Sequence, residues 1–134
     1  MNATEFFAMK LDHETDCADV ADDLTRGRPD LVVIDARVPE LYERGHVPGA
    51  INFPHRTMSA ESVQRLPREA LFVTYCDGIG CNASTKAALK LAGFGFRVKE
   101  MLGGIDWWMR DGLSVARGAE AGSMQPAAAI ACGC

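Results

Sequence analysis

The sequence lacks any long hydrophobic run. None of its 134 residues falls in a stretch that approaches the ~18 consecutive apolar residues a membrane-spanning helix needs. The first residues, MNATEFFAMKLDHE, carry no positive charge ahead of their apolar part, and Lys10 interrupts that part before it is long enough for a signal peptide. These absences predict a soluble, cytoplasmic protein that has no membrane partner.

An excess of positive charge is also absent. Lys and Arg together number 14, Asp and Glu number 18, and the net charge is −4. The basic residues are scattered rather than clustered, so no positive field would gather nucleic acid or anionic lipid. We therefore expect no nucleic-acid partner. The length suits one ordinary domain with its own core and is too short for two.

Cysteine is present, but not in the pattern of a disulfide scaffold. Five cysteines are an odd number in a chain that is 48% hydrophobic, which argues against a secreted fold held by disulfides. Cys17 lies inside an apolar helical pattern and is expected in the core. Cys132 and Cys134 end the sequence; they are either incidental or a resolving dithiol or soft-metal site, and we favour the first because two thiols alone make a poor metal site. No metal or cofactor is expected.

Short apolar runs alternate with helical patterns along the chain, and no hairpin signal separates them. This alternation predicts an α/β domain with a mainly parallel sheet. From residue 117 onward the sequence is rich in small residues and has no periodicity, so we expect a domain at 1–116 and a flexible tail at 117–134. The expected strands are 5–11, 31–35, 50–53, 71–75 and 97–101, and the expected helices are 16–28, 39–46, a weak one at 55–70, 84–92 and 105–112.

Cys76 follows directly on the apolar run 71-LFVTY-75. Ligands of parallel sheets bind at the carboxyl ends of the strands, so this position is a candidate site. The next residues include two glycines and an asparagine, which favour a backbone nest of N–H groups around an anion, and a helix capped by Asn82 or Ser84 follows. Such a setting stabilises a thiolate, although an inert buried cysteine explains these residues equally well. The expected anion-binding residues are Asp77, Gly78, Ile79, Gly80, Cys81, Asn82, Ala83 and Ser84.

Several separated motifs resemble the rhodanese homology domain. The segment 31-LVVIDARVPELYERGHVPGAINFP-54 matches its Asp-x-Arg, Pro-Glu-x-aromatic and Gly-His-Val-Pro-Gly-Ala motifs, and 84-STKAA-88 and 103-GGIDWW-108 follow in the right order. The resemblance spans roughly residues 5–115. It implies a three-layer α/β fold, with a central, mainly parallel five-stranded sheet flanked by helices. It also implies a catalytic cysteine that carries sulfane sulfur as a persulfide, and by motif position that cysteine is Cys76.

The resemblance also assigns roles outside the loop. Asp35 and Arg37 match the Asp-x-Arg motif, which supports the fold on the active-site side, and Arg37 is a possible auxiliary for an anionic substrate. His46 invites a general-base role because it titrates near neutrality, but a packed imidazole that holds the following turn is the better interpretation.

The loop itself departs from the family pattern. Seven residues separate Cys76 from Ser84, more than the family usually has, and none of them is Arg or Lys. Asp77 places a carboxylate beside the nucleophile, and Lys86, one turn into the helix, is the candidate that compensates. We therefore expect a sulfur donor other than simple thiosulfate.

Three functions remain open at this point. The favoured one is a sulfurtransferase that takes sulfur from a small donor and gives it to a thiol, either small or on a partner protein. The second is a redox or persulfide-sensing module, in which Cys81 takes up the sulfur or attacks the Cys76 persulfide and closes a disulfide. The third, a phosphatase or arsenate reductase, needs Cys-x5-Arg, and Asn82 occupies the position of that arginine.

Overall fold

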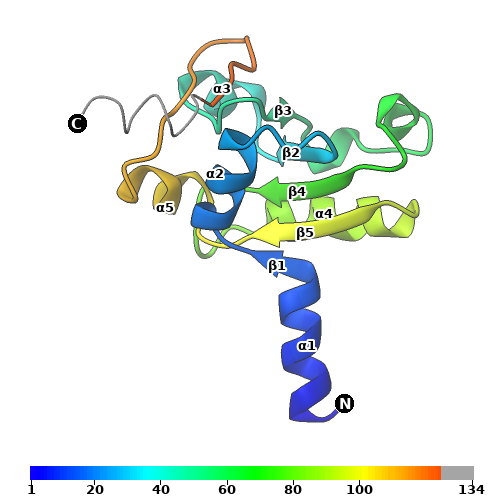
Figure 1. Cartoon of the computed structure of the whole chain (residues 1–134). Coiled ribbons are helices and arrows are strands. Elements are labelled where there is room, and N and C mark those ends of the chain that lie inside the picture. Colours follow the sequence, from blue (N-terminus) through cyan, green and yellow to red (C-terminus); the bar gives the residue numbers. More distant parts are fainter. Residues whose placement is uncertain (125–134) are drawn as a thin grey trace.

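A five-stranded sheet forms the centre of the fold. In the computed structural model, which describes residues 1–124, the strands follow the order β1-β5-β4-β2-β3, and every pairing between them is parallel (Figure 1). The predicted α/β class and five-stranded parallel sheet are confirmed. The strands are β1 (Glu14–Thr15), β2 (Leu31–Asp35), β3 (Ile51–Asn52), β4 (Leu71–Tyr75) and β5 (Arg97–Met101).

Helices cover both faces of this sheet. One face carries α2 (Cys17–Thr25) and α5 (Gly104–Arg110), whose Val20 and Trp108 are fully buried in a shared core. The other carries α4 (Ala83–Gly93) and two short 3-10 helices, η1 (His55–Thr57) and η2 (Ser62–Arg65), around Phe72 and Leu91. A further helix, α3 (Pro39–Arg44), begins with Pro39 in its first turn and connects β2 to β3.

Strands β2 and β4 lie side by side at the middle of the sheet and place the candidate site. They pair along their whole length, from Leu31 opposite Leu71 to Asp35 opposite Tyr75. The side chains of both strands are mainly apolar on both faces, as expected of a sheet that helices cover on each side. Their carboxyl ends therefore meet at one edge, and the loop that begins with Cys76 emerges there.

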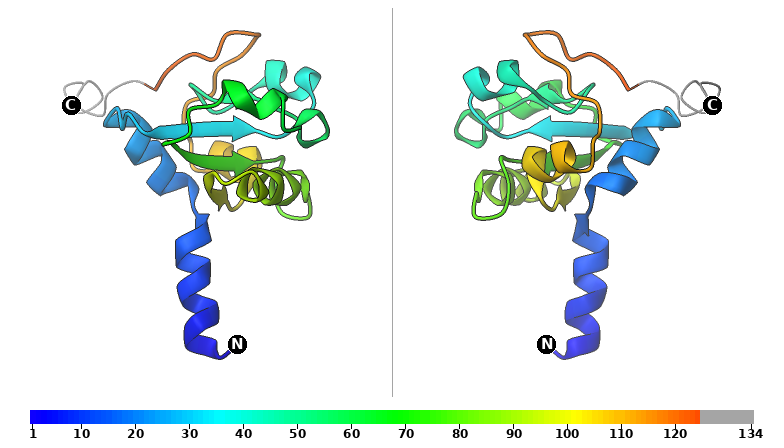
Figure 2. Two further views of the ribbon diagram at one scale, coloured as in Figure 1. Left: turned by 90° about the vertical axis from the view of Figure 1, so that its right-hand side faces the viewer. Right: turned by 90° about the vertical axis from the view of Figure 1, so that its left-hand side faces the viewer.

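The expected strand at residues 5–11 is wrong. These residues form most of α1 (Ala3–His13), and the edge strand is the two-residue β1 that follows. Asn2 caps the helix by accepting a hydrogen bond from the Glu5 N–H at 2.8 Å, and residues such as Ala, Met, Lys and Leu favour a helix. The helix projects away from the sheet (Figures 1 and 2) and buries none of its side chains, so its apolar residues, including exposed Phe6 and Phe7, do not indicate a core strand.

The expected weak helix at 55–70 is also wrong. That segment contains η1 and η2 instead, two short 3-10 turns separated by an extended Met58. Pro54 and Pro67 bracket the segment, and the Ser62 hydroxyl accepts from the Ser59 N–H and donates to the Thr57 carbonyl oxygen, so these backbone groups do not take part in a continuous helix. The other expected helices are present with ends that differ by a few residues.

The chain after α5 crosses back over the α3 side of the domain. His46 and Ala116 exchange two backbone hydrogen bonds of 2.9 Å, and the Gly118 N–H donates to the Glu43 carbonyl oxygen at 2.8 Å. The domain boundary after residue 116 stays a prediction. Within residues 1–124, no helix has both the length and the apolar character needed to cross a bilayer.

Candidate active site

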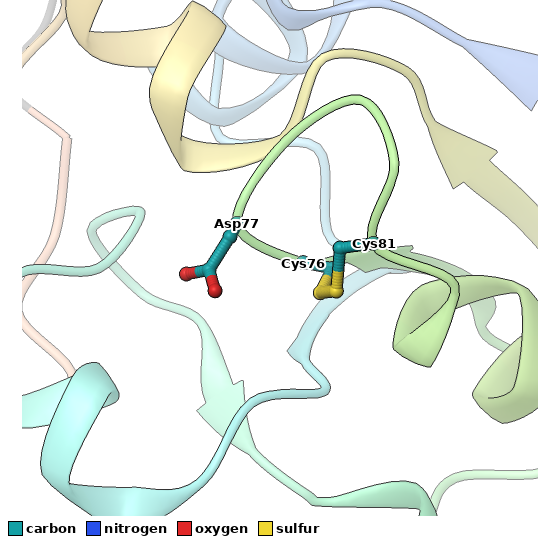
Figure 3. Close-up of side chains that lie close together, drawn as sticks. All are labelled: Cys76, Asp77 and Cys81. Atoms are coloured by element: carbon teal, nitrogen blue, oxygen red, sulfur yellow. A yellow bond between two sulfur atoms is a disulfide. The ribbon is translucent and has the colours of Figure 1, made fainter.

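The loop after β4 is closed by a disulfide between Cys76 and Cys81 (Figure 3). The two Cα atoms are 6.3 Å apart, within the usual range for bridged cysteines. The bond joins the two arms of the loop at its base, where β4 ends and α4 is about to begin. Cys76 is almost fully buried, at 3% exposed, whereas Cys81 is half-buried. The structure therefore shows the oxidised form of the site.

The first turn of α5 holds the first arm of the loop. The Ile105 N–H donates to the Cys76 carbonyl oxygen at 3.0 Å, and the Asp106 N–H donates to that of Asp77 at 2.9 Å. Gly103 and Gly104 make this approach possible, because both have left-handed φ angles, 89° and 60°. The sequence predicted the glycine turn but not its contact with the loop.

The second arm leads into α4. The Cys81 N–H donates to the Gly78 carbonyl oxygen at 3.2 Å, and Gly80 has a left-handed φ of 96°. Asn82 occupies the N-cap position without a capping bond from its side chain, and Ser84 instead donates its hydroxyl to Glu100 at 2.6 Å. The proposed anion nest across this loop, which includes Ile79 at its exposed tip and Ala83 at the start of α4, stays a prediction.

A buried charge network lies under the site. Asp35 is fully buried and accepts hydrogen bonds from Arg37 Nη2 at 2.8 Å and from the Tyr75 hydroxyl at 2.6 Å. Burial alone lowers the pKa of the Arg37 guanidinium, but the hydrogen bonds to Asp35 and its charge outweigh burial and raise that pKa. Burial, followed by the Asp35 charge, raises the pKa of Tyr75, so its hydroxyl remains a donor. The network ties β2 to β4 at their carboxyl ends.

Arg37 extends this network to the loop. Its Nη1 lies 3.2 Å from the Asp77 carboxylate, and its Nη2 also donates to the Gly45 carbonyl oxygen at 2.6 Å. The Asp77 charge beside the cysteines is therefore partly balanced by Arg37, whose hydrogen bonds go mainly to the protein rather than toward a ligand. An Asp77 oxygen and the sulfurs of Cys76 and Cys81 lie within 4.8 Å of one another. Disulfide sulfurs are not thiolates, the form of cysteine that binds metals, so this cluster is not a metal site in the oxidised form.

A cavity of about 230 Å³ opens beside the disulfide. His55 and Arg56 of η1 line this cavity together with both cysteines. These two basic side chains were not predicted from the sequence. Burial lowers the pKa of His55, and the positive charges of Lys90, Lys86 and Arg56 lower it further. Lys86, the residue expected to compensate for the Asp77 charge, is exposed on α4. The walls are completed by Ala36, Arg37, Val38, Leu41, Pro54, Asp77 and Ala83.

A second cavity, of about 330 Å³, lies on the β5 side of the same loop. Cys76 and Cys81 line it as well, together with Ser84, Glu100 and Gly104 among others. The disulfide is thus bordered by two hollows. The first is lined by Arg56 and His55 as well as by the Asp77 carboxylate, whereas the charged side chain at the second is the Glu100 carboxylate.

The remaining cysteine and histidine candidates have structural roles or lie elsewhere. Cys17 is buried in the core as predicted, and burial, with smaller contributions from two carboxylates, raises the pKa of its thiol to about 11. His46 is fully buried, stacks on the Tyr42 ring at 3.6 Å, and places Nδ1 2.8 Å from the Tyr42 carbonyl oxygen. This is the packed imidazole that the sequence favoured. Cys132 and Cys134 lie outside the described residues.

Comparisons with known proteins agree with this architecture. The sequence model of the rhodanese-like domain matches residues 17–111, so the matched region begins after α1. The crystal structure of the BH2092 protein from Bacillus halodurans has 40% identity and a TM-score of 0.82, and the alignment covers 86% of this chain and 84% of that one.

Two curated proteins are also similar. An HTH-type transcriptional regulator of Mycobacterium tuberculosis is 33% identical over 93 residues, which make up 69% of this chain and only 41% of the regulator. The chloroplastic thiosulfate sulfurtransferase 16 of Arabidopsis thaliana is 33% identical over 90 residues, 60% of this chain and 75% of that protein. The match to the domain model and the fold together show that the chain belongs to the rhodanese-like domain family.

Proposed function

We propose that the protein is a sulfurtransferase in which reduced Cys76 carries sulfane sulfur as a persulfide and passes it to a thiol. The observation that carries this proposal is the position of Cys76, at the carboxyl end of a central parallel strand, in a loop that borders two cavities. Similarity to a protein named as a thiosulfate sulfurtransferase supports the same activity.

The chemistry needs a Cys76 thiolate, which forms when the disulfide is reduced. The N-terminal end of α4, which begins at Ala83, brings partial positive charge close to the loop and favours the thiolate. The thiolate attacks the outer sulfur of a donor RS–SH, the donor S–S bond breaks, and RS⁻ leaves. Cys76 then bears the sulfur as Cys76–S–SH, which a thiol acceptor attacks in the next step.

The charges at the first cavity indicate the donor class. The loop has no Arg or Lys of its own, and Arg37 is bonded to Asp35 and Asp77. Among the lining residues, the positive charge that remains is that of Arg56, which attracts an anion without clamping a sulfonate. Lys86 does not line the cavity, although its charge reaches His55. We infer that small persulfides and polysulfides react faster than thiosulfate.

Intact-mass measurement tests the assignment of Cys76. The reduced protein is exposed separately to thiosulfate, to polysulfide and to a small thiol persulfide, as wild type and as Cys76→Ser. Wild type should gain the mass of a sulfur atom or proceed to the Cys76–Cys81 disulfide, and Cys76→Ser should do neither, because it lacks the accepting thiolate. Sulfur uptake in Cys76→Ser equal to that of wild type would show that Cys76 is not the acceptor.

Replacing Arg56 with glutamine should weaken the use of anionic donors. A unit charge several ångströms from the sulfur contributes about 1 kcal/mol in water, so we expect KM for polysulfide to rise roughly fivefold with little change in kcat. Arg26→Gln is the matched control, because it removes the same charge from an exposed position just after α2. Equal effects of both substitutions would mean that Arg56 acts only through net charge.

The disulfide favours a second candidate function. A chain that forms the Cys76–Cys81 bond on exposure to oxidants, without repeated turnover, is a thiol-redox or persulfide sensor. Kinetics with excess donor and reductant separate the two functions. An enzyme, whose disulfide the reductant reopens quickly, releases many equivalents of product for each chain, whereas a sensor, whose disulfide persists under the same reductant, stops after one.

A further inference from the structure

We propose that Cys81 resolves the Cys76 persulfide within the same chain, so that the product is hydrogen sulfide and the second substrate is a dithiol reductant. The inference rests on the proposed function, because it requires sulfur on Cys76. It names the thiol that discharges Cys76 and the form in which the sulfur leaves, both of which the proposed function leaves open. Sulfide release is an activity distinct from sulfur transfer to an external thiol.

The disulfide is the arrangement that this step would produce. Its Cα separation of 6.3 Å falls in the ordinary range, so the loop accommodates the bond between its two arms. The strand end is held independently, since the Ile105 N–H donates to the Cys76 carbonyl oxygen and the Ala36 N–H donates to that of Tyr75. Cys81 lies on the other arm of the loop, directly after Gly80, which has a left-handed φ angle. Movement of that arm alone therefore brings Cys81 to Cys76.

Competition with thiols in solution favours Cys81. Cys76 is 3% exposed, so an external thiol must enter a cavity of about 230 Å³ to reach its sulfur. A thiol in the same loop needs no entry and acts at an effective concentration on the order of millimolar or more.

The step balances without further oxidants. The Cys81 thiolate attacks the Cys76 Sγ, the bond between Sγ and the outer sulfur breaks, and HS⁻ leaves: Cys76–S–SH plus Cys81–S⁻ give Cys76–S–S–Cys81 plus HS⁻. The sulfane sulfur gains two electrons, and the two cysteines lose them. A dithiol then reduces the disulfide and becomes a disulfide itself. The sum converts RS–SH and a dithiol into RSH, hydrogen sulfide and the oxidised dithiol.

Exposure indicates where the reductant attacks. Cys81 is half-buried, whereas Cys76 is almost fully buried, so the reductant thiolate reaches the Cys81 sulfur first and Cys76 becomes the leaving thiolate. A mixed disulfide forms on Cys81, and the second thiol of the reductant resolves it. Cys76 is thereby freed first, in the form that accepts the next sulfur.

A single-turnover experiment tests the role of Cys81. The reduced chain, freed of reductant, is mixed with one equivalent of a small thiol persulfide as wild type, Cys81→Ser and Cys81→Ala. Wild type should release about one equivalent of sulfide and become two hydrogens lighter than the reduced chain. Both Cys81 variants should retain the added sulfur and release sulfide at least about tenfold more slowly, because no thiol in the loop can displace it.

The outcomes separate this inference from the proposed function. Sulfide release at the wild-type rate in both Cys81 variants would overturn the inference, but the proposed function, in which Cys76 first accepts the sulfur, would stand. Absence of any sulfur uptake, in wild type and in both variants alike, would overturn the proposed function itself. A Cys132→Ser/Cys134→Ser chain serves as the control for the terminal thiols. It should release sulfide like wild type, and loss of release there would assign resolution to those cysteines instead.

Discussion

Replacing Asp35 with alanine should lower the free energy of unfolding by about 3–5 kcal/mol, because it leaves a buried arginine without its partner. The Arg37 side chain is 6% exposed and directs Nε and Nη2 at the Asp35 carboxylate. The Tyr75 hydroxyl also loses its acceptor. Asp77 and the Gly45 carbonyl oxygen remain bonded to Arg37, but Asp77 is half exposed and cannot replace a buried carboxylate. Urea denaturation followed by circular dichroism measures the change.

Two further variants decide whether the loss arises from the unpaired charge. Asp22→Ala removes an exposed carboxylate of α2 that pairs with Arg26. It should lower the free energy of unfolding by less than about 1 kcal/mol. The double variant Asp35→Ala/Arg37→Ala should be less destabilised than the sum of its single variants, because it removes both charges. Strict additivity would show that Asp35 and Arg37 act independently, contrary to the network described above.

The elements that the sequence predicted well are those whose own residues determine them. β2 and β4 are continuous apolar runs, and α3 has a proline at its start and a glycine just after its end. Each signal is local, and the order of the elements then determines the sheet. α1 was missed because an apolar run in a short segment fits a strand or a helix, although the Asn2 cap and the helix-favouring residues after it are signals that the sequence does contain.

The candidate site was predictable where it follows from one strand and its loop. Cys76 was placed at the carboxyl end of β4 by its sequence position alone. His55 and Arg56 were not, although they follow β3 and the carboxyl ends of parallel strands share one edge, which is a signal that the sequence does contain. The contacts of Gly104 with the loop depend on packing between distant segments, and the oxidation of the cysteines depends on conditions that a sequence does not encode.

Replacing Gly104 with alanine should disturb the loop at Cys76 more than any change of similar size. The residue has a φ of 60°, where a side chain costs about 1–2 kcal/mol. A methyl group there would lie 2.8 Å from the Asp77 carbonyl carbon and from the Gly78 nitrogen, and closer still to the Cys76 carbonyl oxygen. These are backbone atoms, so the turn and the loop must separate. We expect a loss of roughly 3 kcal/mol in unfolding free energy and about a hundredfold slower sulfur uptake.

Gly112→Ala separates the backbone cost from the collision with the loop. Gly112 follows α5, has a comparable φ of 74°, and has no atom within 4 Å of the position its methyl group would take. It should lose only about 1–2 kcal/mol and take up sulfur at the wild-type rate, as measured by intact mass against time. If Gly104→Ala matched Gly112→Ala in both stability and uptake, the first turn of α5 would not be what holds Cys76 in position. A selective loss in Gly104→Ala would instead show that reactivity at Cys76 depends on two backbone hydrogen bonds from the first turn of α5, given by Ile105 and Asp106.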